Sequence, residues 1–376
     1  MNALCLSTFV AKQGGRMLVK TYAAAVLGTQ ATTITIEVSI SPGTRYFMVG
    51  LPDNTVKESM LRVESALVQS GYKMPRQKIV LNLSPADLKK EGSAFDLAIA
   101  LGILAASGQL LASDLEQYML LGELSLDGKL QSIKGALAMA ILARAEGFVG
   151  MLVPLENARE AAIVSGIKVL GVSSLAEALG VLTGKLKLKP TVVETRKHFK
   201  LDGSVVQADF AEVKGQEQIK RALEIAAAGG HNVILIGPPG SGKTVLARRM
   251  PSILPPLDLQ EALETTKIHS VAGKLGEVKG LVSQRPFRAP HHTISDVAMV
   301  GGGTYPQPGE ISLAHNGVLF LDELPEFKRV VLEVMRQPLE ERSVSISWAR
   351  FTVEFPANFM LIASMNPCNF VDLWQN

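Results

Sequence analysis

Several features that would point to export or to nucleic acid are scarce in this sequence. It has only two cysteines, Cys5 and Cys368, near opposite ends of the 376-residue chain, which suits a reducing cytoplasm and offers no disulfide framework. The 38 Lys and Arg residues nearly balance 35 Asp and Glu, so the net charge of +3 is too small to indicate nucleic-acid binding by overall electrostatics. Any contact with DNA must therefore be local.

Long uninterrupted apolar runs are also missing. The most apolar stretch, residues 97–111, contains polar residues and glycine at 107–109 and falls short of the roughly 20 clean residues that cross a bilayer. We interpret it as a buried helix. Residues 1–16 lack the apolar core and cleavage site of a secretory signal and are expected to be an unstructured extension, with Met17 as an alternative start. We therefore predict a cytoplasmic protein without membrane contact.

The chain does contain enough apolar material for two cores, since 47% of its residues are hydrophobic. Strand-like runs and amphipathic helical segments alternate from residue 18 onward, which predicts an α/β or α+β architecture. The strands are expected at 33–40 and 78–83, and the helices at 56–70, 94–107 and 135–146. A lysine-rich stretch then interrupts the periodicity. We predict domains at 17–184 and 208–376, joined by a linker at 185–207.

The most specific short motif fits the pattern G-x-x-x-x-G-K-[ST], preceded by a strand-like run and followed by a helical one. Glycines in such a loop let backbone N–H groups turn toward phosphate oxygens, and the following helix adds its positive dipole. Lys243 is assigned to the outer phosphates and Thr244 to Mg²⁺. The predicted ATP-binding residues are Gly237, Pro238, Pro239, Gly240, Ser241, Gly242, Lys243, Thr244 and Val245.

Two further strand-like runs end in polar residues. The apolar run 317–321 is typical of a buried parallel strand and leads directly to Asp322 and Glu323. Beside a phosphate loop, Asp322 can hold Mg²⁺ and Glu323 can polarise the attacking water. A third run, 359–364, precedes Asn366, which we predict to sense the γ-phosphate. Together with the loop lysine, Glu323 and Asn366 are the predicted catalytic residues.

Three longer stretches, residues 213–232, 285–292 and 309–316, resemble the magnesium-chelatase-like AAA+ proteins of the YifB/ComM group. Matching stretches at 50–59 and 83–93 extend the resemblance over nearly all of residues 17–366. It implies an α/β protein in which a Lon-protease-like α+β domain precedes a P-loop AAA+ domain with a parallel sheet. It also implies ATP hydrolysis with Mg²⁺ and assembly of the chain with itself into a ring, usually a hexamer.

The Lon-like part raises the question of peptidase activity. The position of the Lon nucleophile carries Ala94 and the position of the Lon lysine carries Leu137, and neither side chain can act in a Ser–Lys dyad. Ser93 and Lys134 lie close by in the sequence and leave a shifted dyad open. We predict that this domain has no peptidase activity and serves as a scaffold or interaction module.

The resemblance also implies a substrate for the motor. Family members drive branch migration on DNA during natural transformation, whereas the chelatase relatives insert Mg²⁺ into a porphyrin. Residues 342–355 have the alternation of a β-hairpin, so we assign Arg342, Trp348 and Arg350 to DNA contacts. An ordinary surface hairpin, a chelatase-like or chaperone-like subunit, and a nucleotide-binding module without hydrolysis are the open alternatives.

The chain departs from the resemblance at its carboxyl end. Cys368 is not followed by the further cysteines of the relatives, so no zinc cluster is expected. The helical lid and the arginine finger would follow residue 376, and we interpret the chain as a truncated copy with weakened turnover. The adjacent His291 and His292 should point in different directions in a helix or strand. A structural role, or contact with the nucleotide through a neighbour, is favoured over zinc for them.

Overall fold

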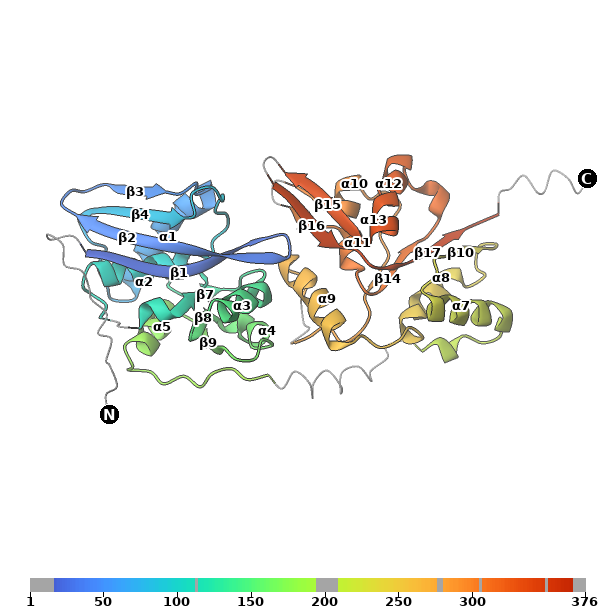
Figure 1. The fold of residues 1–376 in the computed structure, drawn as a ribbon, viewed down its shortest axis with the longest axis horizontal. Helices are drawn as coiled ribbons and strands as arrows, with labels where there is room; N and C mark the ends of the chain where they lie inside the picture. Colours follow the sequence, from blue (N-terminus) through green and yellow to red (C-terminus); the bar gives the residue numbers. More distant parts are fainter. Residues whose placement is uncertain are drawn as a thin grey trace, which may run out of the picture. The chain divides into compact units, whose positions relative to one another are not determined.

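The computed structural model describes residues 17–111, 114–193, 209–275, 280–303, 306–348 and 351–367. The predictions for residues 1–16, for most of the linker, for Arg350 and for Cys368 lie outside these described residues. The chain divides into two compact units after residue 193, except that residues 27–30 group with the second unit, and both units combine helices with a sheet (Figure 1). No helix in the described ranges is long and apolar enough to cross a membrane.

The first unit is built on a seven-stranded mixed sheet in the order β3-β4-β2-β1-β5-β8-β9. The strands are β1 (Met17–Leu27), β2 (Gln30–Ser41), β3 (Tyr46–Val49), β4 (Lys78–Ser84), β5 (Tyr118–Leu120), β8 (Gly150–Pro154) and β9 (Lys168–Val172). The β2–β4 pair is antiparallel, whereas β4 is parallel to β3 and the pairs β1–β5, β5–β8 and β8–β9 are parallel. In β2, buried Ile34, Ile36 and Val38 alternate with partly exposed residues, as a strand with one core face requires.

Helices and a short hairpin complete this unit. They are α1 (Asn54–Gln69), α2 (Asp96–Ala106), α3 (Ala136–Ala145), α4 (Ala158–Ala161) and α5 (Leu175–Leu182), with β6 (Glu123–Leu124) pairing β7 (Leu130–Gln131). Helix α1 begins where the Asp53 carboxylate accepts a 2.7 Å hydrogen bond from Val56 N. All residues of α2 are buried, which confirms the buried helix predicted within the apolar stretch 97–111.

The second unit contains a four-stranded parallel sheet in the order β10-β17-β14-β11. Its strands are β10 (Val233–Ile236), β11 (Phe287–Arg288), β14 (Val318–Leu321) and β17 (Met360–Met365). The helices are α7 (Glu217–Gly229), α8 (Lys243–Arg249), α9 (Leu259–Val271), α10 (Asp296–Val300), α11 (Glu310–Leu313), α12 (Arg329–Glu333) and α13 (Arg336–Glu341). Because the strands are parallel, their carboxyl ends meet at one edge, where ligands bind in such sheets.

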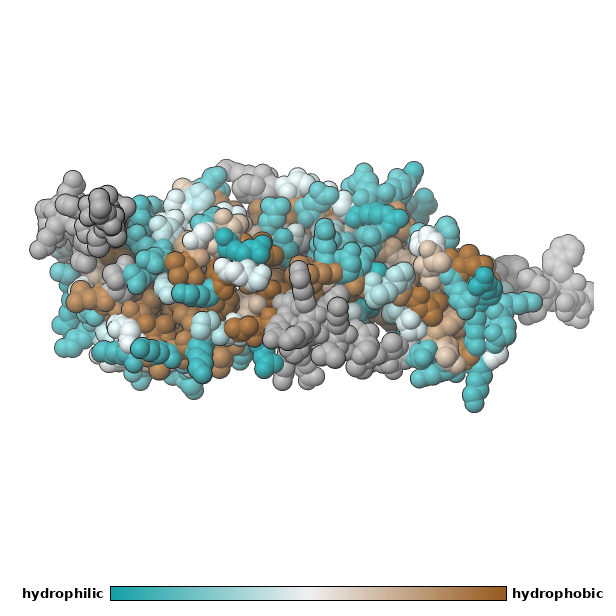
Figure 2. Space-filling view, turned by 60° about the horizontal axis from the view of Figure 1, so that its bottom comes forward, coloured by the Kyte–Doolittle hydropathy of each residue, from teal (hydrophilic) through white to brown (hydrophobic). Residues whose placement is uncertain are grey.

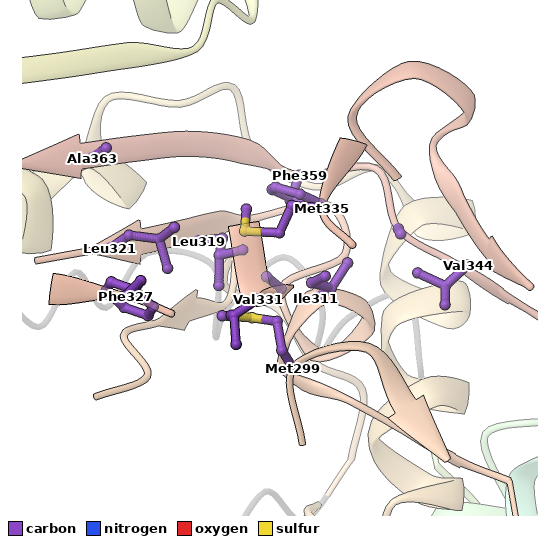
Figure 3. Packing of buried hydrophobic residues seen from close by; sticks show 12 residues of the cluster. Met299, Ile311, Leu319, Leu321, Phe327, Val331, Met335, Val344, Phe359 and Ala363 are labelled. Atoms are coloured by element: carbon purple, nitrogen blue, oxygen red, sulfur yellow. The ribbon is translucent and has the colours of Figure 1, made fainter. Parts of the chain in front are cut away.

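Strand β14 is buried on both faces, which explains its unbroken apolar sequence. Leu319 and Leu321 belong to a cluster that includes Val331 of α12 (Figure 3). The alternate residues, Val318 and Phe320, pack into a second cluster with residues of α7 and α8. Because β14 is packed on both faces, the positions of Asp322 and Glu323, which directly follow it, are fixed.

Strand β10 is the edge strand of this sheet and is anchored less completely. Val233 and Leu235 pack against the second cluster, whereas Ile234 and Ile236 are 49% and 61% exposed. Exposed apolar side chains also occur among the polar ones on the face of the molecule drawn in Figure 2. The glycine-rich loop therefore follows a strand that the described residues cover on one face only.

The predicted hairpin is confirmed as a structural element. Strands β15 (Ser343–Trp348) and β16 (Phe351–Pro356) are antiparallel and form a separate two-stranded sheet. Their register pairs Ser343 with Pro356 at the base and Trp348 with Phe351 at the tip. Buried Val344 and Phe355 attach the strands to the protein interior.

Candidate nucleotide site

The glycine-rich loop leaves β10 at its carboxyl end and leads directly into α8. Gly240 and Gly242 have φ values of +78° and +85°, which glycine adopts without the strain that a side chain would add. The side-chain amide of Gln216 donates a 3.0 Å hydrogen bond to Ser241 O and braces the loop from outside. The Ser241 hydroxyl is buried and has no hydrogen-bond partner among the described residues. The loop thus has the backbone shape that a phosphate group needs.

Lys243 places its ammonium group at the mouth of this loop. Its Nζ donates to Gly237 O at 2.7 Å, to Pro238 O at 3.0 Å and to the Asn366 side-chain oxygen at 3.1 Å. Neutral oxygens accept weaker hydrogen bonds than a phosphate does, so an incoming phosphate can replace them. The structure therefore brings Lys243 and Asn366 together, as expected for residues that share one phosphate.

Thr244 and Asp322 also meet, although 78 residues separate them. Thr244 Oγ1 donates to Asp322 Oδ2 at 2.9 Å, and the Ser364 hydroxyl donates to the other carboxylate oxygen. Ser364 is fully buried in β17, the strand between β10 and β14. We did not predict Ser364 from the sequence, although a serine in an apolar strand, on the same face as Asn366 two residues later, is a usable signal.

These oxygens suit a magnesium ion that arrives with a nucleotide. Within the described ranges, no three His, Cys, Asp or Glu side chains gather where they could hold a metal ion without further ligands. Mg²⁺ takes one or two protein oxygens and completes its shell with phosphate and water. The hydroxyl of Thr244 and the carboxylate of Asp322 are hard oxygen donors of this kind, and they lie beside the loop. The residues present therefore fit Mg²⁺ bound together with ATP.

Glu323 follows Asp322 in an unusual backbone conformation. Its φ is +55°, in the left-handed region that non-glycine residues rarely occupy. Its backbone N–H points to Asp322 Oδ1 at 3.2 Å, and Ser364 Oγ lies 3.4 Å away. The turn separates the two neighbouring carboxylates, because Asp322 engages Thr244 while Glu323 remains 57% exposed. The Asp322 carboxylate is thus engaged by two neighbouring hydroxyls, whereas the Glu323 side chain is largely open to solvent.

The two adjacent histidines lie in a turn after β11, so the expectation that their side chains diverge is wrong. That expectation assumed a helix or a strand, whereas the turn brings the His291 and His292 ring centroids within 4.0 Å of each other. His292 Nδ1 also lies 3.8 Å from a Glu323 carboxylate oxygen. A structural role, or contact with the nucleotide through a neighbour, stays the prediction for the two histidines, and Glu323 is a neighbour of His292 on the nucleotide side.

Of the three residues assigned to DNA, the structure describes the backbone positions of Arg342 and Trp348. Arg342 precedes β15 and donates a hydrogen bond to the Asn358 side chain at the base of the hairpin. Trp348 ends the strand, about 20 Å away for six residues of extended chain. Arg350 lies outside the described residues. Arg342 therefore lies at the base of the hairpin, and the assignment of Arg342, Trp348 and Arg350 to DNA stays a prediction.

The shifted peptidase dyad has no support from the described contacts of the first unit. The Ser93 hydroxyl donates to the Glu123 carboxylate, whereas Lys134 is exposed on the surface. Leu137 is fully buried, and its backbone N–H donates to Glu160 at 2.9 Å. Leu137, the residue at the position of the Lon lysine, is thus part of the hydrophobic core. This burial agrees with the predicted scaffold role of the domain.

Comparison with known proteins identifies the family. The model described as "Magnesium chelatase, subunit ChlI" matches residues 209–375, and "Subunit ChlI of Mg-chelatase" matches residues 36–157. YifB of Salmonella typhimurium is 50% identical over 91% of this chain and 67% of its own length. Competence protein ComM of Haemophilus influenzae is 48% identical over 92% of this chain and 68% of its own length. The chain belongs to the YifB/ComM family.

Members of the YifB/ComM family carry a ChlI-like amino-terminal domain and a magnesium-chelatase AAA domain, and this chain has both. It spans about two thirds of the length of YifB and ComM. Lon protease 2 of Bacillus subtilis is also similar, at 32% identity over 41% of this chain and 29% of its own length. The magnesium-chelatase domain implies the ATPase fold and the general use of ATP with Mg²⁺.

Proposed function

We propose that this chain binds ATP with Mg²⁺ and hydrolyses it as part of a ring-forming DNA motor of the branch-migration type. The observation that carries the proposal is the convergence, at one edge of a parallel sheet, of Lys243, Asn366, Thr244, Asp322 and Glu323. They come from segments separated by as many as 123 residues. A nucleoside triphosphate with its magnesium ion is the ligand whose recognition uses these five residues together.

Each of these residues has a distinct task in the proposed reaction. The loop amides and Lys243 bind and orient the phosphates, and Thr244 and Asp322 hold the bound Mg²⁺, which neutralises phosphate charge. Glu323 accepts a proton from the water that attacks the γ-phosphorus while the bond to the ADP oxygen breaks. Asn366 bridges the phosphate loop and the end of β17, so it is placed to report whether a γ-phosphate is present.

Membership of the family supports DNA as the substrate on which this energy is used. One relative carries the printed name competence protein, and competence involves uptake of DNA. In this chain the β15–β16 hairpin lies in sequence between β14, which precedes Asp322 and Glu323, and β17, which precedes Asn366, with α12 and α13 between β14 and the hairpin. We assign base stacking to the aromatic Trp348 and phosphate contact to the basic Arg350, both from the sequence of this hairpin segment.

The motor proposal is tested by ATP hydrolysis with single-stranded, branched or no DNA. We expect DNA to raise the hydrolysis rate of the chain, and the double variant Trp348→Ala, Arg350→Ala to lose this stimulation while keeping its basal rate. Ser345→Ala, on an exposed position of the same hairpin, is the matched control and should behave like the wild type. Hydrolysis that ignores every DNA would reject the DNA motor. Assembly is measured by mass photometry, where a monomer at all concentrations with ATP would reject the ring.

Chelatase-like action is the second candidate, because both family models carry the ChlI name. The magnesium-chelatase 67 kDa subunit of Heliobacterium mobile is 28% identical over only 42% of this chain. The YifB and ComM matches have higher identity and cover more than twice as much of this chain, at 91% and 92%. The likeness therefore favours the DNA motor.

A further inference from the structure

The His292 imidazole is held in place from two sides. The His291 ring lies 4.0 Å away, centroid to centroid, at an angle of 35°. On another side, the Phe327 ring packs edge-on at 6.5 Å, and Phe327 itself is only 4% exposed. A ring fixed by a buried aromatic neighbour has a defined orientation, and here that orientation directs Nδ1 toward Glu323, 3.8 Å away.

The pair comes from two adjacent strands of the sheet. β11 and β14 are parallel and hydrogen-bonded, with Phe287 beside Val318 and Arg288 beside Leu319. His292 follows the carboxyl end of the first strand and Glu323 that of the second. Their contact therefore joins the segments that follow two adjacent strands of the sheet that builds the nucleotide site.

Glu323 needs such a support because its own surroundings leave it mobile. Its side chain is 57% exposed and extends from a left-handed backbone position. A general base acts only when its carboxylate is within reach of the attacking water, and a mobile carboxylate spends little time there. One oxygen engaged by a fixed neighbour leaves the other available to the water.

We propose that His292 is a positioning residue for Glu323, holding one carboxylate oxygen through Nδ1 so that the other can accept the proton of the attacking water. The inference rests on the proposed ATP hydrolysis and names a residue to which nothing in the family comparison assigns a role. His292 does not contact the loop residues that bind phosphate in any hydrogen bond described here. Its loss therefore lowers turnover without lowering nucleotide affinity.

Three variants separate positioning from packing. His292→Phe keeps a ring between His291 and Phe327 but removes the nitrogen, so we expect kcat to fall about 10- to 100-fold, the usual cost of losing a residue that orients a functional ligand. His292→Asn loses the ring but carries an amide nitrogen near the position of Nδ1, and should recover most of the rate. His291→Phe keeps the stacking and is the control, with wild-type kcat.

The measurements are kcat and KM for ATP, together with the Kd for a fluorescent ATP analogue. The expected result is a fall in kcat for His292→Phe with Kd within twofold of the wild type. An active wild type with an equally active His292→Phe variant would overturn the positioning role and leave the proposed hydrolysis intact. A wild type that binds nucleotide but never hydrolyses it would reject both. Equal losses in the Phe and Asn variants would also overturn the positioning role, because the amide nitrogen would then not restore the rate.

Discussion

Replacing Arg62 by leucine should destabilise the first unit in a way that depends on pH. Arg62 of α1 donates to the Asp96 carboxylate of α2 at 2.6 Å through Nε and at 3.0 Å through Nη2. The Asp96 side chain is fully buried, and its remaining partner is Leu124 N at 3.1 Å. Removing one member of a buried ion pair leaves an uncompensated charge, which typically costs about 3 to 5 kcal/mol.

The sign of the pH dependence follows from the pKa of Asp96. Burial raises it from 3.8 to about 6, although Arg62 and the Leu124 N–H act in the opposite direction. For an acid whose folded pKa is raised, the contribution to stability is fully present below the unfolded pKa and is lost as pH rises through the folded one. A rise from 3.8 to about 6 is worth about 3 kcal/mol.

In Arg62→Leu the opposing influence of the arginine is gone, so the pKa of Asp96 rises further. The carboxyl group is then protonated at pH 5, whereas at pH 8 its burial requires either an unpaired charge or an uptake of a proton from solution, both of which cost free energy. We expect the substitution to cost about 3 to 5 kcal/mol at pH 8 and about 1 kcal/mol at pH 5, where only neutral hydrogen bonds are lost.

Hydrogen exchange measured by mass spectrometry on the α2 peptide, corrected for the intrinsic pH dependence of exchange, gives the free energy of opening. The control is the same substitution in an Asp96→Asn background, where the cost should be small and independent of pH. A cost in Arg62→Leu that is equal at pH 5 and pH 8 would refute the reasoning.

Two further predictions concern the nucleotide site. Glu323→Gln should bind ATP with unchanged Kd and lose about 10²- to 10⁴-fold in kcat, because it removes the general base alone. A binding titration measures the Kd and a single-turnover assay measures the rate. A normal rate would exclude Glu323 as the base. In wild-type protein, ATP should bind more tightly with Mg²⁺ than with EDTA. Asp322→Asn should abolish this difference in affinity, because Thr244 alone is a weak magnesium ligand. A persistent difference would show that other residues hold the metal.

The sequence predicted best where local pattern and global fold agree. The elements around the phosphate loop were located within about two residues, because a buried strand such as β14 needs an apolar residue at every position and its acids must follow it. The same reasoning predicts that Lys243, Thr244, Asp322 and Asn366 lie at one edge of the parallel sheet. Their hydrogen bonds now connect them directly.

What the sequence did not predict depends on contacts between distant segments. Ser364 and Gln216 were missed, since no spacing rule relates Ser364 to Asp322 or Gln216 to Ser241. The error about the two histidines had a different cause. The expectation assumed that a helix or a strand continues through His291 and His292. Strand β11 is only two residues long and ends at Arg288, so both histidines lie beyond it in irregular chain.

The central claim is that the loop beside Lys243 is a triphosphate site, and isothermal titration of the folded chain with ATP and Mg²⁺ tests it most directly. We expect saturable binding of one nucleotide per chain. Lys243→Ala should weaken it by at least about 150-fold, because two hydrogen bonds from a charged donor are worth about 3 kcal/mol. A folded wild-type chain that ignores millimolar ATP, or a lysine variant that binds as tightly as the wild type, would contradict the account.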